Sequence, residues 1–171
     1  MNQKELAPKL EELHADSFAW ALRCCFEDRA SAKEVMQNTY LKILDGKAKY
    51  KAGAAFKTWL FSVIRFTAID YYRANRRCET VLLDPNHAPT ENMVTEMDEN
   101  TGNAQKQAVL QKALSELSPQ QNRVLHLVFY QNCSIAEAAE IMNIQLGTAR
   151  SHYERGKRQL KRRLIALSFK R

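Results

Sequence analysis

The fold class follows most directly from residues 134–163, which read SIAEAAEIMNIQLGTARSHYERGKRQLKRR. This stretch predicts a short helix, a tight turn and a long basic helix, which is the sequence form of a helix-turn-helix. Ser134 and Glu137 have the spacing of a capping box at the start of the first helix. Asn143 suits the left-handed conformation of the turn, and Ile144 is expected to anchor that turn. The stretch therefore predicts a helical domain built to dock on a polyanion.

The second helix of this motif has two distinct faces. Spacings of four, three and four residues predict an inward stripe of Ala149, Tyr153, Gly156 and Leu160. The residues left to face outward are Arg150, Ser151, His152, Arg155, Lys157, Arg158, Lys161 and Arg162. Arginine can donate two parallel hydrogen bonds to guanine, whereas lysine mainly neutralises phosphate. The outward face therefore predicts duplex DNA binding, and the alternative is a basic, solvated helix end.

Charge is unevenly distributed along the 171 residues, whose formal net charge is +7. Residues 1–78 carry 14 basic and 9 acidic side chains, residues 79–104 carry 6 acidic side chains and no Lys or Arg, and residues 105–171 carry 12 basic and 4 acidic side chains. Clustered like charges repel one another, and a partner of opposite charge relieves that repulsion. Two basic segments on either side of an acidic connector therefore predict that the chain binds a polyanionic partner through two separate surfaces.

Several classes of protein are disfavoured by what the sequence lacks. The start, MNQKELAPKL, has no apolar core of a secretion signal, and no run approaches the roughly 20 apolar residues of a membrane span, so a cytoplasmic protein is expected. The cysteines, Cys24, Cys25, Cys78 and Cys133, show no paired metal-ligand spacing and are expected to be reduced. Because the five glycines are scattered and no nucleophile constellation is present, neither a cofactor, a metal nor catalysis is predicted.

Composition divides the chain into two helical domains. Residues 79–104 contain two prolines and no basic residue, which favours a flexible acidic linker between domains at 1–78 and 105–171. In the first domain, apolar periodicity predicts helices over Leu6–Phe26, Ser31–Leu44 and Ala54–Arg77. About four more helices are predicted after the linker, the first of them over 105–116. The chain is therefore predicted to be all-α.

A capping serine and a proline mark the next helix of the second domain. Ser118 is expected to be the N-cap, with Pro119 at the first helical position. The apolar stripe that follows consists of Val124, Leu125, Val128 and Phe129.

The third predicted helix combines aromatic residues with a basic end, a composition typical of single-strand binding. A regular helical stripe favours core packing for Phe56, Trp59, Leu60, Val63, Ile64, Thr67 and Tyr71. The remaining surface candidates are Phe61, Arg65, Asp70, Arg73, Arg76 and Arg77. The preceding segment, 45–53, is predicted to be a loop that carries Lys47, Lys49 and Lys51, and it either lines a strand channel or is simply solvated.

At this point the chain resembles the bacterial extracytoplasmic-function (ECF) sigma factors of the sigma-70 family, group IV. The resemblance rests on EVMQNTYL at 34–41, FKTWL at 56–60, AIDYYR at 68–73 and LSPQQ at 117–121, continuing through Gly147 and Thr148 to Arg163. The order and spacing of these pieces cover nearly the whole chain. They imply a region 2 bundle of three to four helices joined by the linker to a region 4 helix-turn-helix bundle.

By this resemblance the chain is a non-enzymatic promoter-specificity subunit that binds the clamp and flap of core RNA polymerase. Region 4 would read the upstream (−35) element with a helix from about Gly147 to Arg163, through Thr148, Arg150, Ser151, His152, Arg155, Lys157 and Arg158. Region 2 would melt the −10 element: the 47–55 loop would hold a flipped base, and Asp70, Arg73 and Arg77 would face the opening duplex. The resemblance also makes an anti-sigma factor a candidate partner.

One departure from the family pattern concerns the polymerase-binding segment, which the resemblance assigns to Ser31, Lys33, Glu34, Gln37, Asn38 and Leu41. The family normally has Asp-Ala-Glu-Asp where this chain begins with Ser31, and another acid where it has Asn38. Only Glu34 of four usual acids remains, and Lys33 reverses one charge. At a partly desolvated interface the loss of a charge partner costs roughly 2–5 kcal/mol, so weaker polymerase binding is expected.

Two explanations of this departure are open. Either other contacts compensate, or a Ser/Thr kinase adds negative charge at Ser31 or Thr39, since each phosphate brings about −1.5 to −2 charge at pH 7. The competing structural reading makes Ser31 and Glu34 a capping box, and it makes Thr39 a packing residue beside Met36 and Ile43.

Two other functions compete with the sigma-factor interpretation. A polymerase-independent two-domain regulator would bind duplex DNA without polymerase, its first domain serving dimerisation or ligand sensing. An RNA-modifying or nucleotide-using enzyme would need a catalytic constellation, and none is found in the sequence.

Overall fold

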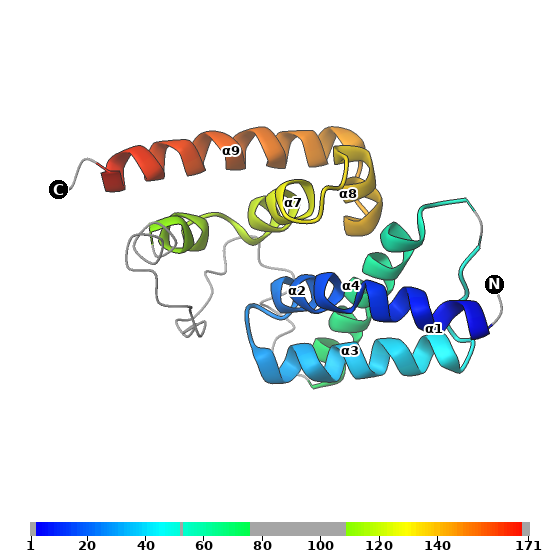
Figure 1. Cartoon of the computed structure of the whole chain (residues 1–171). Helices are drawn as coiled ribbons and strands as arrows, with labels where there is room; N and C mark the ends of the chain where they lie inside the picture. The colour runs from blue at the N-terminus through cyan, green and yellow to red at the C-terminus, as the bar shows by residue number, and fades with distance from the viewer. Residues whose placement is uncertain (1–2, 52, 76–108, 169–171) are drawn as a thin grey trace.

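A computed structural model of the chain describes residues 3–51, 53–75 and 109–168 (Figure 1). All of its long regular elements are helices, as predicted. The first half contains α1 (Gln3–Glu12), α2 (His14–Cys24), α3 (Arg29–Leu44) and α4 (Phe56–Ala74). The second half contains a helical stretch at 109–115, followed by α7 (Pro119–Phe129), α8 (Ile135–Met142) and α9 (Leu146–Ser168). The predicted linker, 79–104, lies outside the described residues.

In the first half α2, α3 and α4 pack against one another through their apolar residues. The predicted helix over Leu6–Phe26 is instead two helices that meet at Leu13. Hydrogen bonding continues through the junction, from the Leu13 amide to the Lys9 carbonyl at 3.2 Å and from the Ser17 amide to the Leu13 carbonyl at 2.8 Å. The segment is therefore helical as predicted, with a change of direction that the periodicity did not indicate.

The start of α3 differs from the prediction in a way that matters for Ser31. Asp28 is the N-cap, and its carboxylate accepts hydrogen bonds from the backbone amides of Ala30 and Ser31. Helix α3 therefore begins two residues earlier, at Arg29, and the predicted capping box of Ser31 and Glu34 is wrong. The two residues before the cap, Phe26 and Glu27, have φ of 53° and 64°, which turns the chain sharply out of α2.

The local signals of the second half are confirmed. Ser118 caps α7 and Ser134 caps α8, each in a complete capping box, with Gln121 and Glu137 respectively as the reciprocal partners. Asn143 ends α8 in the left-handed conformation, with φ 49° and ψ 49°. These features set the turn that directs α9 across α7 and α8.

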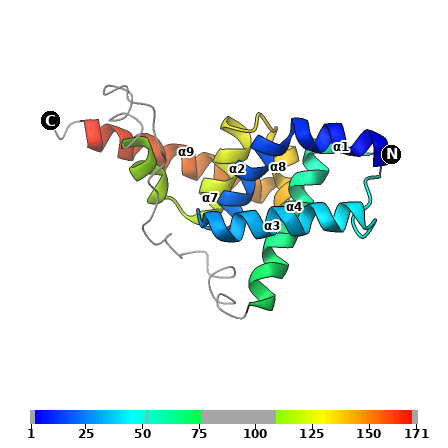
Figure 2. The same cartoon turned by 60° about the horizontal axis from the view of Figure 1, so that its bottom comes forward.

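The two halves also pack against each other, α4 against α8 and α2 against α7 (Figures 1 and 2). The buried apolar residues form one cluster that contains members of both halves, among them Trp20, Phe61, Val124 and Ile141. In Figure 1, α3 and α9 lie on opposite sides of the molecule with the other helices between them. Among the described helices, none combines the length and apolar composition that crossing a membrane requires.

Candidate nucleic-acid interface

Helix α9 presents its basic residues on the surface because a small-residue face packs inward. Ala149 and Gly156 are buried, and a Cβ placed on Gly156 would lie 3.1 Å from Leu125 Cδ1 and 3.2 Å from Gln121 Cβ of α7. Glycine at 156 therefore allows α9 to approach α7 closely. The predicted inward stripe is confirmed, since Tyr153 and Leu160 on it are half-buried.

The outward face is as predicted, except for one residue. The exposed members of the predicted duplex-binding set are Thr148, Arg150, Ser151, Arg155, Lys157 and Arg158. His152 is only half-buried between the two faces, and burial, followed by the Arg155 charge, lowers the pKa of its imidazole. Because its neutral form is favoured, His152 adds little positive charge to this face.

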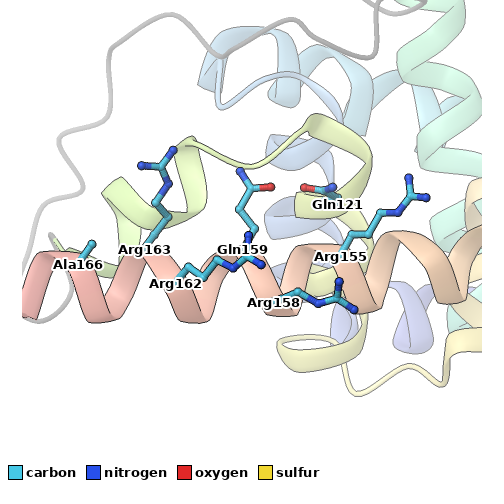
Figure 3. Close-up of a pocket in the computed structure, with 7 residues that line it drawn as sticks. All are labelled: Gln121, Arg155, Arg158, Gln159, Arg162, Arg163 and Ala166. Carbon is cyan, nitrogen blue, oxygen red and sulfur yellow. The ribbon is translucent and has the colours of Figure 1, made fainter.

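An open, basic groove runs along the C-terminal half of α9 (Figure 3). Its volume is about 580 Å³, and it is lined by Gln121, Arg155, Arg158, Gln159, Arg162, Arg163 and Ala166. Arg163 is used within the fold, since its Nε lies 2.7 Å from Glu116 Oε2, and Gln159 Nε2 donates to the Glu116 carbonyl at 3.0 Å. The sequence did not single out the two glutamines, because their place beside the arginines depends on how α7 crosses α9.

The predicted loop at 45–53 is held by an aromatic anchor. The Tyr50 ring lies edge-on to Phe56 and Trp59, with ring centroids 5.4 Å apart in both pairs, and its hydroxyl donates to the Ala54 carbonyl at 2.7 Å. The lysines around this anchor, Lys47, Lys49 and Lys51, are exposed, and Lys47 Nζ lies 3.2 Å from Asp45 Oδ2. The loop therefore presents exposed lysines, and the contacts of Tyr50 hold it in place.

The remaining predicted contacts of the first domain are spread along α4. Asp70 and Arg73 are exposed, and Asp70 Oδ2 pairs with Lys42 Nζ of α3 at 2.8 Å. Arg65 is half-buried, and burial lowers the pKa of its guanidinium. Arg76 and Arg77 lie outside the described residues.

The prediction that Phe61 lies on the surface is wrong. Its side chain is fully buried, its ring stacks on Trp20 at a centroid distance of 6.1 Å, and Lys57 Nζ lies 5.4 Å above it. Periodicity indicated a single buried face of α4. A second face is also buried: Phe61 packs on Trp20 of α2, and the Thr58 hydroxyl lies 3.5 Å from Glu137 Oε1 of α8.

Helix α3, which lies on the opposite side of the molecule from α9 (Figure 1), carries an exposed stripe of residues. Its members from the predicted polymerase-binding set are Lys33, Glu34, Gln37, Asn38 and Leu41. Leu41 and Leu44 have 50% and 49% of their surface exposed, which is high for leucine. Ser31, the other predicted member, is buried and so does not belong to this stripe.

The phosphorylation hypothesis has no support in the structure. The Ser31 hydroxyl donates to the Asp28 carboxylate and lies 3.4 Å from the Tyr71 hydroxyl. The Thr39 hydroxyl is fully buried and donates to the Val35 carbonyl at 2.7 Å. A dianionic phosphate at either position would displace packed side chains, and Ser31 phosphate would also lie against Asp28.

No candidate metal cluster of His, Cys, Asp or Glu is present within the part of the chain that the structure describes. Cys24, Cys25 and Cys133 are buried free thiols, and burial raises the pKa of Cys24 and of Cys133 to about 11. The pKa of Cys25 is raised further, by burial and then by Cys24. These thiols therefore stay protonated and unreactive at neutral pH.

Comparisons with known proteins agree with this geometry. The model of sigma-70 region 2 matches residues 10–78, and the model of sigma-70 region 4 matches residues 107–160. The chain is 26% identical over 134 residues to RNA polymerase sigma factor YlaC of Bacillus subtilis, covering 78% of each protein. It is 23% identical over 144 residues to ECF RNA polymerase sigma factor SigX of the same species, covering 82% of this chain and 74% of that protein.

A solved structure shows the same fold. The sigma factor RpoE of Bartonella quintana, solved in complex with the anti-sigma factor NepR, superposes with a TM-score of 0.73 at 22% identity. The match covers 95% of this chain and 98% of RpoE.

Proposed function

Because the chain belongs to the sigma-70 family, as an ECF RNA polymerase sigma factor with regions 2 and 4, we propose that it binds core RNA polymerase and reads a promoter at two places. An ECF sigma factor directs promoter-specific transcription initiation and is not an enzyme. The observation that carries the proposal is the placement of two helices with exposed functional residues: the basic helix α9 lies on one side of the molecule, and α3, which carries the exposed stripe, lies on the other (Figure 1).

Region 4 reads the duplex −35 element through α9. The exposed Arg150 and Ser151, near the start of this helix, suit base edges. The basic groove around Arg155, Arg158 and Arg162 suits the phosphate backbone. Base contacts are assigned to the start of α9, and phosphate contacts to its C-terminal half, because the N-terminal residues of a recognition helix enter the major groove.

Region 2 recognises and melts the −10 element. The loop that carries Lys47, Lys49 and Lys51 attracts the separated strand, and its Tyr50 anchor fixes the loop's position before DNA arrives. Arg73 extends the same basic surface along α4. With Phe61 buried, a flipped base is held by the loop rather than by that ring.

Core polymerase docks on the α3 stripe. Of the two explanations for its missing acids, compensation by other contacts is favoured, because Leu41 and Leu44 offer apolar area beside Glu34 and Gln37. We further propose that an anti-sigma factor controls the chain, as NepR is bound to RpoE in its complex.

The test is the affinity of the full chain for bacterial core RNA polymerase. The wild type is expected to bind, and Glu34→Lys is expected to weaken binding at least about 30-fold, the equivalent of roughly 2 kcal/mol. Glu140→Lys makes the same charge reversal at an exposed position of α8 and is the matched control. Binding to duplex DNA without any binding to polymerase would favour the polymerase-independent regulator.

A further inference from the structure

Helix α9 contains two glycines, and the packing of the chain explains only one of them. Gly156 lies against α7, where an added Cβ would come within 3.1 Å of Leu125 Cδ1. A Cβ built on Gly147, in the first turn of α9, would meet no described atom within 4 Å apart from its own helix. Because glycine weakens a helix relative to alanine, its presence at 147 needs another reason, such as the close approach of a partner.

Leu146, the first residue of α9, places an apolar side chain on the surface beside this glycine. It has 40% of its surface exposed, whereas Ile144, two residues earlier, packs against the hydrophobic core. A single exposed leucine is common in proteins and has no meaning by itself. Here, however, it adjoins the unexplained Gly147 at the end of α9 that enters the major groove in the proposed function.

Leu146 and Gly147 share one face of α9 with the residues that suit base edges. Side chains three and four positions apart are neighbours on a helix, so Arg150 adjoins both of them. The Ser151 hydroxyl donates a hydrogen bond to the Gly147 carbonyl at 3.0 Å, which orients this side chain toward the same turn. All four residues are exposed. They form a continuous surface that is open to a partner.

The start of α9 differs in chemistry from its basic C-terminal half. Residues 143–149 read NIQLGTA, and the first charged side chain of the helix is that of Arg150. The first turn therefore has no charged side chain with which to attract phosphate. Among the groups that the major groove presents, the 5-methyl group of thymine is the one that an apolar side chain contacts favourably. An exposed leucine at this position is therefore suited to a thymine.

We propose that Leu146 reads the 5-methyl group of a thymine in the −35 element, and that Gly147 lets the backbone of α9 approach that base pair closely. This contact rests on the proposed function, because it specifies what the start of the recognition helix touches. Leu146 and Arg150 are about 6 Å apart along the helix, and base pairs stack about 3.4 Å apart. The thymine therefore lies one or two base pairs from the base that Arg150 reads.

Replacing thymine by uracil isolates the methyl group, because uracil keeps the same hydrogen bonds to adenine. Burial of one methyl-sized apolar group changes an affinity about fourfold, so this is the loss expected at the thymine that Leu146 contacts. Leu146→Ala removes the other partner of the same contact. The loss from uracil and the loss from Leu146→Ala should therefore overlap instead of adding, as in a double-mutant cycle.

The test measures the affinity of the full chain for a −35 duplex by fluorescence anisotropy. The duplex is obtained by selecting tightly bound sequences from a random pool with the wild type, and each thymine is then replaced in turn by deoxyuridine. The wild type is expected to lose about fourfold in affinity at one thymine. Leu146→Ala should bind the original duplex about fourfold more weakly and lose nothing more with deoxyuridine at that position. Ile165→Ala is the matched control, because Ile165 is 47% exposed near the other end of α9, and it should keep the fourfold loss.

Gly147→Ala tests the close approach separately. The new Cβ meets no described side chain, so circular dichroism should show that the helices are retained. Affinity for the selected duplex should nevertheless fall about tenfold, because the added methyl group occupies space that the base pair needs.

Three results would overturn the proposed contact. The first is a wild type that binds every deoxyuridine duplex as tightly as the original, and the second is a fourfold loss that persists in Leu146→Ala. The third is a Gly147→Ala variant with wild-type affinity for the selected duplex. A selection that enriches no sequence would refute the reading of the −35 element by region 4, and the thymine contact with it.

Discussion

Replacing Phe61 by alanine should test most sharply which faces of α4 belong to the core. The Phe61 ring is fully buried, stacks on Trp20 and lies under Lys57 Nζ. Its removal leaves a cavity, and Phe→Ala changes in cores cost about 3–5 kcal/mol of unfolding free energy. The hydrogen bond from Trp20 Nε1 to the Phe61 carbonyl, 3.0 Å long, involves only the backbone at 61 and does not offset this loss.

Phe66 on the same helix is the matched control for this change. It has 46% of its surface exposed, so Phe66→Ala should alter stability by no more than about 0.5 kcal/mol. Urea unfolding, followed by circular dichroism and by tryptophan fluorescence, should show a midpoint about 2 M lower for Phe61→Ala than for Phe66→Ala. A Phe61→Ala variant of full stability that no longer binds single-stranded promoter DNA would refute this reasoning and restore Phe61 as a base-stacking residue.

Three further predictions follow from caps, burial and the recognition face. Arg150→Ala should cost roughly 1–3 kcal/mol of binding free energy on the cognate −35 duplex and relax sequence preference, whereas Lys157→Ala should weaken binding to cognate and scrambled duplexes alike. Fluorescence anisotropy measures both affinities. If Arg150→Ala lost equal affinity for the two duplexes, that would argue against base readout. Ser134→Ala should cost about 1 kcal/mol of stability at pH 7. Hydrogen bonds from the Ser134 amide and hydroxyl lower the pKa of Glu137, so this cost should shrink as pH falls below 4.5, and a constant cost in urea titrations across that range would contradict the capping account. Thr39→Glu should lower stability and polymerase affinity together, because the hydroxyl is buried; improved binding would revive the phosphorylation switch.

Local sequence signals predicted the second half of the chain well. The two serine caps, the left-handed Asn143 and the glycine of α9 each depend on neighbours within a few residues, so their spacing carries the information. Phe129 is the exception: it was placed in the apolar stripe of α7, but 54% of its surface is exposed and its ring stacks on Tyr153. Which side of an apolar helix is covered depends on the next helix, not on the helix alone.

Contacts between the two regions were not predictable from sequence. His126 and Gln131 gave no signal as separate residues, and only the packing of α7 on α2 places them against Trp20 and Asp16. Phe61, which periodicity placed outside, is buried where its ring stacks on Trp20. The prediction that Ser31 caps α3 was wrong for a local reason instead. Asp28, three residues earlier, is the N-cap because its carboxylate accepts hydrogen bonds from two backbone amides.

Promoter-directed initiation in a reconstituted system tests the central conclusion most directly. Bacterial core RNA polymerase, with and without the full chain, is supplied with fragmented genomic DNA, and the 5′ ends of the transcripts are sequenced. We expect a discrete set of start sites that appear only with the chain and share one element near −35 and one near −10. Transcripts that are unchanged by the chain, although the chain binds duplex DNA, would contradict the sigma-factor assignment.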